Sequence, residues 1–188
     1  MLKITEKEIL DFRKHGKKIL KEVGFRPGEN PARKWHQYKH PLRQAKNYII
    51  VIICRYLPPC EFKNDLYRLM GAQIGKNVSI ANDSILDTIF PELIKIEDNV
   101  IIGWGTKIFT HEFTPMKFRV GSVLIKKNSM IGESSIVRPA VTIGKDSMIA
   151  AMSFANEDVE DGTLEGGVPI HVIKHHQRVF QRKRRRLL

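Results

Sequence analysis

An aliphatic residue returns at every sixth position along two long stretches of the sequence, and this period restricts the fold more than any other feature. The two stretches are residues 74–108, with one insertion, and residues 125–149. The aliphatic positions are Ile74, Ile80, Leu86, Ile96, Ile102, Ile108, Ile125, Ile131, Val137, Ile143 and Ile149. A period of six matches neither the helical period of about 3.6 nor the strand period of about 2. It is typical of a short strand and a tight turn that repeat.

Small residues recur in register with these aliphatics. Glycine follows directly in Ile74-Gly75, Ile102-Gly103, Ile131-Gly132 and Ile143-Gly144, and a small or β-branched residue usually follows four positions after each aliphatic. We expect the aliphatic side chain to point inward and the glycine to relieve the backbone at the turn. Three such units make one triangular coil, and the coils stack like parallel strands about 4.8 Å apart. The sequence therefore predicts an all-β parallel β-helix.

The period is interrupted twice and then ends. Phe90-Pro91-Glu92-Leu93 is a short insertion, and residues 113–124, with Pro115 and Gly121, predict a loop that leaves a coil corner. After Val159 the pattern stops, and a C-terminal helix or a basic tail is expected. We therefore place the β-helix at residues 66–173 and a basic tail at residues 174–188.

Residues 1–65 lack the repeat and predict a helical or irregular cap. Lys3–Glu22 favours a short surface helix, and Phe25–Lys39, with its prolines and glycine, is expected to be irregular. Leu42–Leu57 is apolar with basic residues around it, which predicts a helix covering the open end of the coils. A foot that binds a membrane surface is the alternative for this segment.

A net charge of +12 requires an anionic partner, such as nucleic acid, anionic lipid or a phosphorylated cofactor. The run Arg182-Lys-Arg-Arg-Arg predicts a solvated tail or a phosphate-binding segment. Nucleic acid is not expected as the partner, because no nucleic-acid-binding module accompanies the run. Cys54 and Cys60 fit reduced thiols in a cytoplasm. Tyr48–Cys54 is too short to span a bilayer, and the first residues do not form a secretory signal. We expect a cytoplasmic protein that peripheral contact could bring to the inner face of a membrane.

Several motifs resemble a known family. Ile74-Gly-Lys-Asn-Val, Ile143-Gly-Lys-Asp-Ser and Gly166-Gly-Val-Pro are similar to segments of the hexapeptide-repeat acyltransferases, in particular the branch of the maltose and galactoside O-acetyltransferases. The resemblance covers residues 66–173. It implies a left-handed β-helix and a homotrimer with acetyl-CoA in the groove between neighbouring chains. It also implies transfer of an acetyl or other small acyl group to a hydroxyl of a sugar or related acceptor.

The reaction needs a base for the hydroxyl proton, a group that orients the base, and donors to the thioester oxygen. His111 is the only histidine between Ile74 and Val159, and the resemblance places the catalytic histidine there. Asp87 is the preferred orienting acid, because the related enzymes carry an acidic residue near the acceptor at this corner. Glu112 is the alternative, but adjacent side chains on an extended chain point to opposite faces. Arg119 is a candidate acceptor contact or a solvated charge.

The resemblance also indicates where acetyl-CoA would bind. It assigns the oxyanion donor to the backbone N–H of Glu133 and the pantetheine corner to Ala151. The sequence departs from the family at Asn156-Glu157 and at His171, where relatives often carry Thr-Lys and a basic residue. The positive charge that binds the nucleotide end of acetyl-CoA would then have to come from other residues. The candidates are Arg138, Lys145 and Lys174, each of which is otherwise an ordinary surface cation.

Other functions of such a fold fit less well. A trimeric γ-class carbonic anhydrase needs three zinc-binding histidines from the repeats, so no metal is expected. A sugar nucleotidyltransferase needs a further N-terminal domain, for which there is no room. A catalytically inactive trimeric scaffold, or a protein that binds anionic surfaces, remains the alternative because of the basic ends and the altered acetyl-CoA positions.

Overall fold

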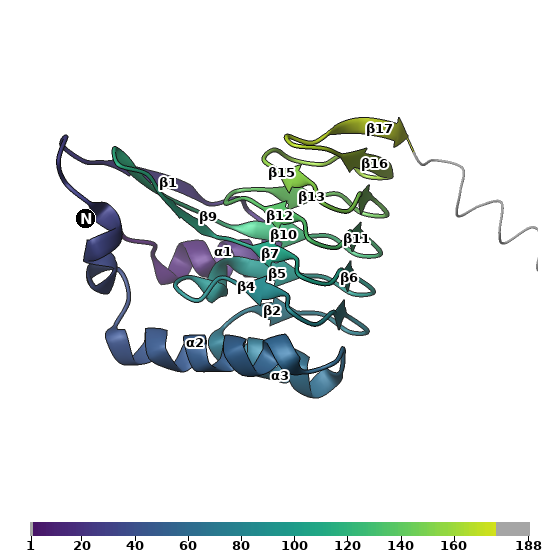
Figure 1. Cartoon of the computed structure of the whole chain (residues 1–188), viewed down its shortest axis with the longest axis horizontal. Helices are drawn as coiled ribbons and strands as arrows, with labels where there is room; N and C mark the ends of the chain where they lie inside the picture. The colour runs from purple at the N-terminus through teal and green to yellow at the C-terminus, as the bar shows by residue number, and fades with distance from the viewer. Residues whose placement is uncertain (1, 176–188) are drawn as a thin grey trace, which may run out of the picture.

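Three parallel sheets with a shared core dominate this computed structural model, which describes residues 2–175. The first sheet holds β2 Gln73–Ile74, β5 Ile94–Ile96, β10 Val123–Ile125 and β13 Thr142–Ile143. The second holds β3 Ser79–Ile80, β6 Ile101–Ile102, β11 Met130–Ile131, β14 Met148–Ile149, β16 Thr163–Gly166 and, antiparallel to the rest, β17 His171–His175. The third holds β4 Ile85–Leu86, β7 Lys107–Ile108, β12 Ile136–Val137 and β15 Phe154–Ala155. The chain visits the sheets in turn, so its coils stack (Figure 1).

The six-residue aliphatics form the core that joins these sheets. In the first sheet, Ile74 pairs with Ile96, which pairs with Ile125, which pairs with Ile143. The aliphatics of the other two sheets align in the same way, and all of them are buried in one cluster. The period predicted from the sequence therefore produces the observed register.

The corners between strands hold residues that tolerate tight turns. Asn77, Asn99 and Asn128 have positive φ, a conformation that asparagine adopts more readily than most residues. Their side chains form a ladder from coil to coil, in which Asn77 donates to Asn99 at 2.9 Å and Asn99 to Asn128 at 3.2 Å. At another corner, a Cβ at Gly103 would lie 2.5 Å from the backbone nitrogen of Glu133. Glycine is therefore required there because the next coil lies so close.

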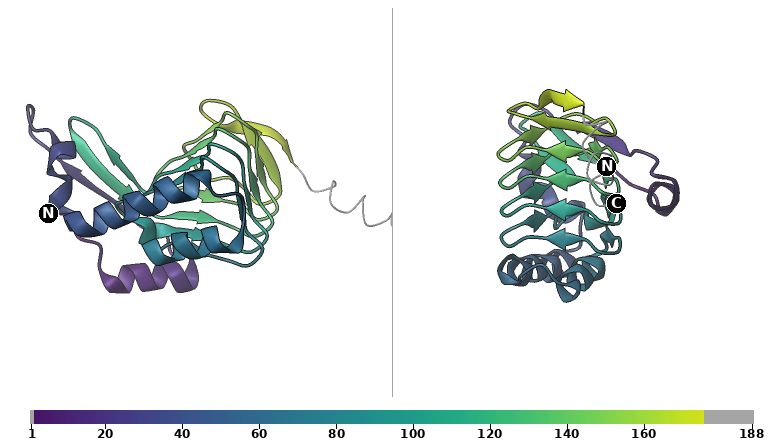
Figure 2. Two further views of the ribbon diagram at one scale, coloured as in Figure 1. Left: turned by 60° about the horizontal axis from the view of Figure 1, so that its bottom comes forward. Right: turned by 90° about the vertical axis from the view of Figure 1, so that its right-hand side faces the viewer.

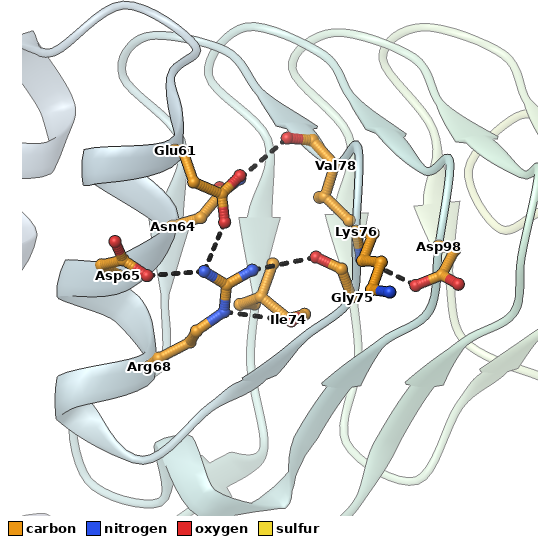
Figure 3. Close-up of polar contacts among 9 residues, drawn as sticks. All are labelled: Glu61, Asn64, Asp65, Arg68, Ile74, Gly75, Lys76, Val78 and Asp98. Carbon is orange, nitrogen blue, oxygen red and sulfur yellow. Dashed lines mark hydrogen bonds and ion pairs between the residues drawn. The ribbon is translucent and has the colours of Figure 1, made fainter.

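Two helices, α2 Pro41–Tyr56 and α3 Glu61–Met70, cover one end of the stack (Figures 1 and 2). Their buried side chains join the core cluster of the coils: Ile50, Val51, Cys54, Tyr67 and Met70. Arg68 fastens this cap to the first coil, since Nε donates to the Ile74 carbonyl at 3.1 Å and Nη2 to the Gly75 carbonyl at 2.9 Å (Figure 3). The sequence predicted α2 but not α3. Because α3 runs to Met70, the coils begin at Gln73 and not at residue 66.

The rest of the N-terminal region differs from the prediction. The helix α1 Glu6–His15 ends at Gly16, and residues 20–24 form a strand, β1 Leu20–Gly24, where a continuous helix was expected. A 3-10 helix, η1 Pro31–Gln37, follows in the segment predicted to be irregular, and a second, η2 Pro91–Leu93, forms the short insertion. The helix α1 is also not purely a surface element, because Phe12 is fully buried in a second apolar cluster with Phe118 and Leu93.

The excursion predicted as a loop is a β-hairpin. Its strands are β8 His111–Phe113 and β9 Lys117–Gly121, and β1 pairs with β9 in an antiparallel sheet that extends away from the coils (Figure 2). At the C-terminal end, β16 and β17 form an antiparallel pair, and β17 runs to His175, two residues into the segment that was expected to be a basic tail. The predicted basic run Arg182–Arg186 lies outside the described residues. No helix of residues 2–175 is long and apolar enough to cross a membrane.

Candidate active site

Asp87 lies at the corner that follows β4, and its carboxylate is fully buried. Oδ1 accepts hydrogen bonds from the backbone N–H groups of Ile89 at 2.7 Å and Phe90 at 3.1 Å. Oδ2 accepts from the N–H of Thr110 at 2.9 Å and that of His111 at 3.2 Å. A buried carboxylate needs such donors, because an unpaired charge in the interior is strongly unfavourable. Asp87 therefore ties the turn after β4 to the turn after β7.

The charge of Asp87 is retained despite this burial. Burial alone would raise the pKa of the carboxyl, but the nearby His111 and the hydrogen bonds from His111, Thr110 and Phe90 together hold the pKa below its ordinary value. Asp87 is therefore an anion at neutral pH, as an orienting partner of a catalytic histidine must be.

His111 follows β7 by three residues, and its Nδ1 lies 2.5 Å from Oδ2 of Asp87. A carboxylate only accepts hydrogen bonds, so neutral His111 carries its proton on Nδ1 and leaves a lone pair on Nε2. The rings of Phe90, Phe113 and Phe118 lie 5.3–6.3 Å from the imidazole, centroid to centroid, and fix its plane. The side chain is still 19% exposed, so the imidazole can reach a bound molecule.

Strand alternation separates Glu112 from this pair. In the pairing of β8 with β9, His111 lies opposite Val120 and Glu112 lies opposite Arg119. The side chains of Glu112 and Arg119 therefore share the face of the hairpin away from the aromatic rings. Glu112 accepts from Nε and Nη2 of Arg138 at 3.0 and 2.8 Å, and Arg119 pairs mainly with Glu22 at 2.5 Å. The contact with the His111 ring is thus made by Asp87 and not by Glu112. Arg119 and Arg138, proposed for acceptor and cofactor, are both bound to carboxylates of the chain itself.

Glu133 and Ala151 lie at a different corner from His111. Glu133 follows β11 and precedes β12, and it therefore lies at the opposite end of the third sheet from His111, which follows β7. Within the described part of the chain, no group accepts a hydrogen bond from the Glu133 N–H. Ala151 is stacked one coil beyond, against Gly132. This corner presents an available backbone donor, but not to the His111 of the same chain.

The remaining predicted residues are dispersed. Lys145 follows β13 at the third corner, where its ammonium lies 3.3 Å from Asp146. Lys174 and His171 are on β17 at the end of the stack, and Asn156 follows β15 one coil beyond Arg138. In residues 2–175 no group of three or more histidine, cysteine, aspartate or glutamate side chains could hold a metal ion.

The structure adds neighbours of His111 that the sequence did not indicate. Tyr38 packs on Phe118 with ring centroids 4.3 Å apart, and the Thr110 hydroxyl donates to the Phe90 carbonyl at 3.0 Å. From the second helix, Asn47 donates to the Thr88 carbonyl at 2.8 Å and so fixes the turn beside Asp87. The buried asparagine in an apolar helix was a usable signal for this contact, whereas nothing in the sequence linked Tyr38 to the hairpin.

Comparison with known proteins finds relatives and solved structures that are named acetyltransferases. No protein-family model matches the chain. A Bacillus subtilis protein named "Putative acetyltransferase YvoF" is 36% identical over 151 residues, which are 79% of this chain and 88% of the relative. A hexapeptide-repeat-containing acetyltransferase of Vibrio cholerae, solved with acetyl coenzyme A, superposes with a TM-score of 0.62 at 20% identity, covering 72% of this chain and 88% of that one. A galactoside acetyltransferase solved with coenzyme A gives 0.55 at 18% identity, covering 73% and 82%.

Proposed function

The chain belongs to the hexapeptide-repeat acetyltransferases and is a CoA-dependent acyltransferase, and from this premise we propose that it moves an acetyl group from acetyl-CoA to a hydroxyl of a sugar or a related acceptor. The observation that carries the proposal is the hydrogen bond between Nδ1 of His111 and the buried carboxylate of Asp87. It supplies an oriented imidazole whose Nε2 is free to take a proton, which is the group that this reaction requires.

The reaction proceeds in two steps, attack and collapse. The acceptor hydroxyl gives its proton to Nε2 of His111, and its oxygen attacks the thioester carbonyl. The N–H of Glu133 donates to the oxyanion, where a fixed backbone dipole is most effective. The C–S bond then breaks, the acetyl group stays on the acceptor oxygen, and the leaving thiolate takes the proton from His111. Asp87 holds the imidazole and stabilises its charged form throughout.

We favour direct attack over a covalent acyl-enzyme because of where the cysteines lie. Cys54 is buried in the cap, and burial raises the pKa of its thiol to about 11, which disfavours the reactive thiolate. Cys60 is exposed, but it precedes α3 at the end of the stack and not at the corner that holds His111. A trapped acyl-cysteine at either position would contradict direct attack.

The site requires a second copy of the chain in this proposal. His111 and the Glu133 amide lie at opposite ends of the third sheet, so a groove between neighbouring chains of a trimer would bring the base of one chain to the amide of the next. A closed, left-handed β-helix is the form of the coil in this proposal. Ala151, Lys145 and Lys174 are its remaining acetyl-CoA contacts, and Arg138 and Arg119 take part only if their carboxylate partners release them.

Substitution of His111 by alanine tests the proposed base. We expect turnover, followed as thiol release from acetyl-CoA, to fall by ~10²-fold or more, because general-base help contributes about 10²–10⁴-fold. Affinity for acetyl-CoA, measured by calorimetry, should hardly change, since the base acts mainly in the transition state. His36→Ala, at an exposed histidine of the N-terminal segment, is the matched control. Full turnover by His111→Ala with the true acceptor would refute the role.

A further inference from the structure

The outward face of the helical cap is apolar, which is unusual for the surface of a folded chain. Eight large hydrophobic side chains of α2 and α3 are each 40% or more exposed: Leu42, Tyr48, Ile49, Ile52, Ile53, Tyr56, Phe62 and Leu69. We call them the cap face. The opposite side of α2, with Ile50, Val51 and Cys54, is buried on the coils. A surface helix normally has a polar outer side, and a helix that is apolar all round is normally covered by something.

The cap face is continuous because of helical spacing. Leu42, Ile49, Ile52, Ile53 and Tyr56 recur at intervals of three, four and seven residues, so they share one side of α2. The two helices lie side by side beneath the stack and form its end (Figures 1 and 2). Phe62 and Leu69 recur at seven residues on α3 and extend the same apolar area. An exposed patch of this kind marks an interaction site.

Charge around the cap face decides between possible partners. Lys46 and Arg55 are on the flanks of the α2 stripe, whereas Arg43 is at the N-terminal end of α2 on the line of Asn47, Ile50 and Cys54. Arg43 makes no ion pair with any residue of 2–175, Lys46 donates only to the Leu69 carbonyl, and Arg55 pairs with Asp83. On α3, the acidic Glu61 and Asp65 are both bound to Arg68 (Figure 3). An apolar face with Lys46 and Arg55 on its two flanks matches an anionic lipid surface.

We propose that the cap face docks the enzyme on the surface of an anionic lipid bilayer. The side chains fit this partner, since the isoleucines can enter the boundary between headgroups and acyl chains while Tyr48 and Tyr56 keep their hydroxyls in the headgroup layer. The basic side chains can reach the lipid phosphates beside them. The helix α2 has 16 residues, so it lies along the surface and does not cross the bilayer. The chain's net charge of +12 favours the approach to such a surface.

Vesicle sedimentation with the full chain tests this docking. The wild-type chain should sediment with phosphatidylcholine vesicles that contain about a quarter of phosphatidylglycerol, far less with phosphatidylcholine alone, and less as salt screens the charges. Ile49→Asp and Ile53→Asp should each lower the partition coefficient at least ~10-fold, because an aspartate cannot enter the apolar layer. Val172→Asp, at an exposed apolar residue of β17 away from the cap, should bind within about twofold of wild type. Equal thermal melting curves confirm that the variants are folded.

Three outcomes would overturn the proposal. The first is a wild-type chain that does not sediment with the anionic vesicles at low salt. The second is Ile49→Asp binding like wild type, which would assign vesicle binding to another basic segment of the chain. The third is Ile49→Asp lowering the mass of the particle in light scattering without any change in vesicle binding, which would make the cap face a contact between two copies. None of these sedimentation and light-scattering results depends on acyl-transfer activity.

Discussion

At the corner after β4, Asp87 and His111 satisfy each other, and either alone would leave a buried or half-buried polar group without its partner. The sequence predicted both residues, because His111 ends a coil and Asp87 follows the aliphatic at the equivalent position one coil before. Alternation along the strand also favoured Asp87 over Glu112. The four backbone donors to Asp87 were not predictable. Ile89 and Phe90 depend on how the chain turns into the insertion, and Thr110 and His111 on how the next coil turns into the hairpin.

Asp87→Asn should lower both stability and turnover. We expect a loss of about 3–5 kcal/mol in the free energy of unfolding at pH 7, because an amide NH₂ would face backbone donors where the carboxylate accepts from them. Turnover should fall by roughly 10²-fold or more while the KM for acetyl-CoA stays nearly constant, as expected for a residue that positions the base. Urea unfolding and thiol-release kinetics measure the two effects. Asp83→Asn, at a half-exposed aspartate that pairs with Arg55, should cost within about 1 kcal/mol.

The same residue gives stability a pH dependence. The pKa of Asp87 is lower in the folded chain than its ordinary value, so the folded state favours the ionised form. Its contribution is therefore complete above the carboxyl's unfolded pKa of about 3.9 and is lost as the pH falls through the lower folded value. Unfolding curves of wild type and Asp87→Asn, measured from pH 7 downward, should converge at acidic pH. A stability difference that is constant over this range would contradict the assignment.

At the scale of elements, the hairpin β8–β9 is where the sequence interpretation was least complete. Pro115 and Gly121 suggested a loop, yet Phe118, Arg119 and Val120 alternate apolar and polar as a strand does. That alternation could be recognised in the sequence, but the pairing with β1 could not. β1 lies about a hundred residues earlier, and its adjacent charged residues Lys21 and Glu22 break the alternation of apolar and polar positions. The hairpin is stabilised by this third strand and by the second apolar cluster, neither of which follows from the six-residue period.

Phe118 is the side chain that joins this hairpin to the site. It is fully buried and stacks on Phe113 with ring centroids 4.3 Å apart, and it lies 6.3 Å from the His111 ring. Phe118→Ala should lower the free energy of unfolding by about 3–5 kcal/mol, the usual cost of such a cavity. Met116→Ala, at the exposed tip of the same hairpin, should change it by no more than about 0.5 kcal/mol. Similar losses in chemical denaturation of the two variants would show that the hairpin does not depend on its aromatic core.

For the whole molecule, the period of six predicts the stack but says nothing about which corners of it form one site. The predicted residues are divided between the corner of His111 and the corner of Glu133, and both are at the ends of the third sheet. This division follows from how the coil distributes its strands among the three sheets, which the period of six does not determine. In the proposed trimer it has a measurable consequence. The mass in light scattering should be that of three chains of 21.7 kDa each, and a mass near one chain would contradict the assembly.

Mixing two inactive variants tests whether each site combines two chains. His111→Ala removes the base, and Glu133→Pro removes the backbone N–H, which donates to no group in the described chain. Ser134 has a φ of 56°, so residue 133 precedes a left-handed residue, where proline is common in a type II turn. Because the nitrogen of residue 133 packs closely on Gly103, a thermal melting curve equal to that of wild type must accompany the result. In a ring of three, any mixed trimer contains one contact that joins an intact base to an intact amide. Refolding the variants together in equal amounts should therefore restore about a quarter of wild-type activity, from about three quarters mixed trimers with one working site in three. No recovery would mean that each chain holds a complete site, and an active Glu133→Pro alone would exclude its amide as the oxyanion donor.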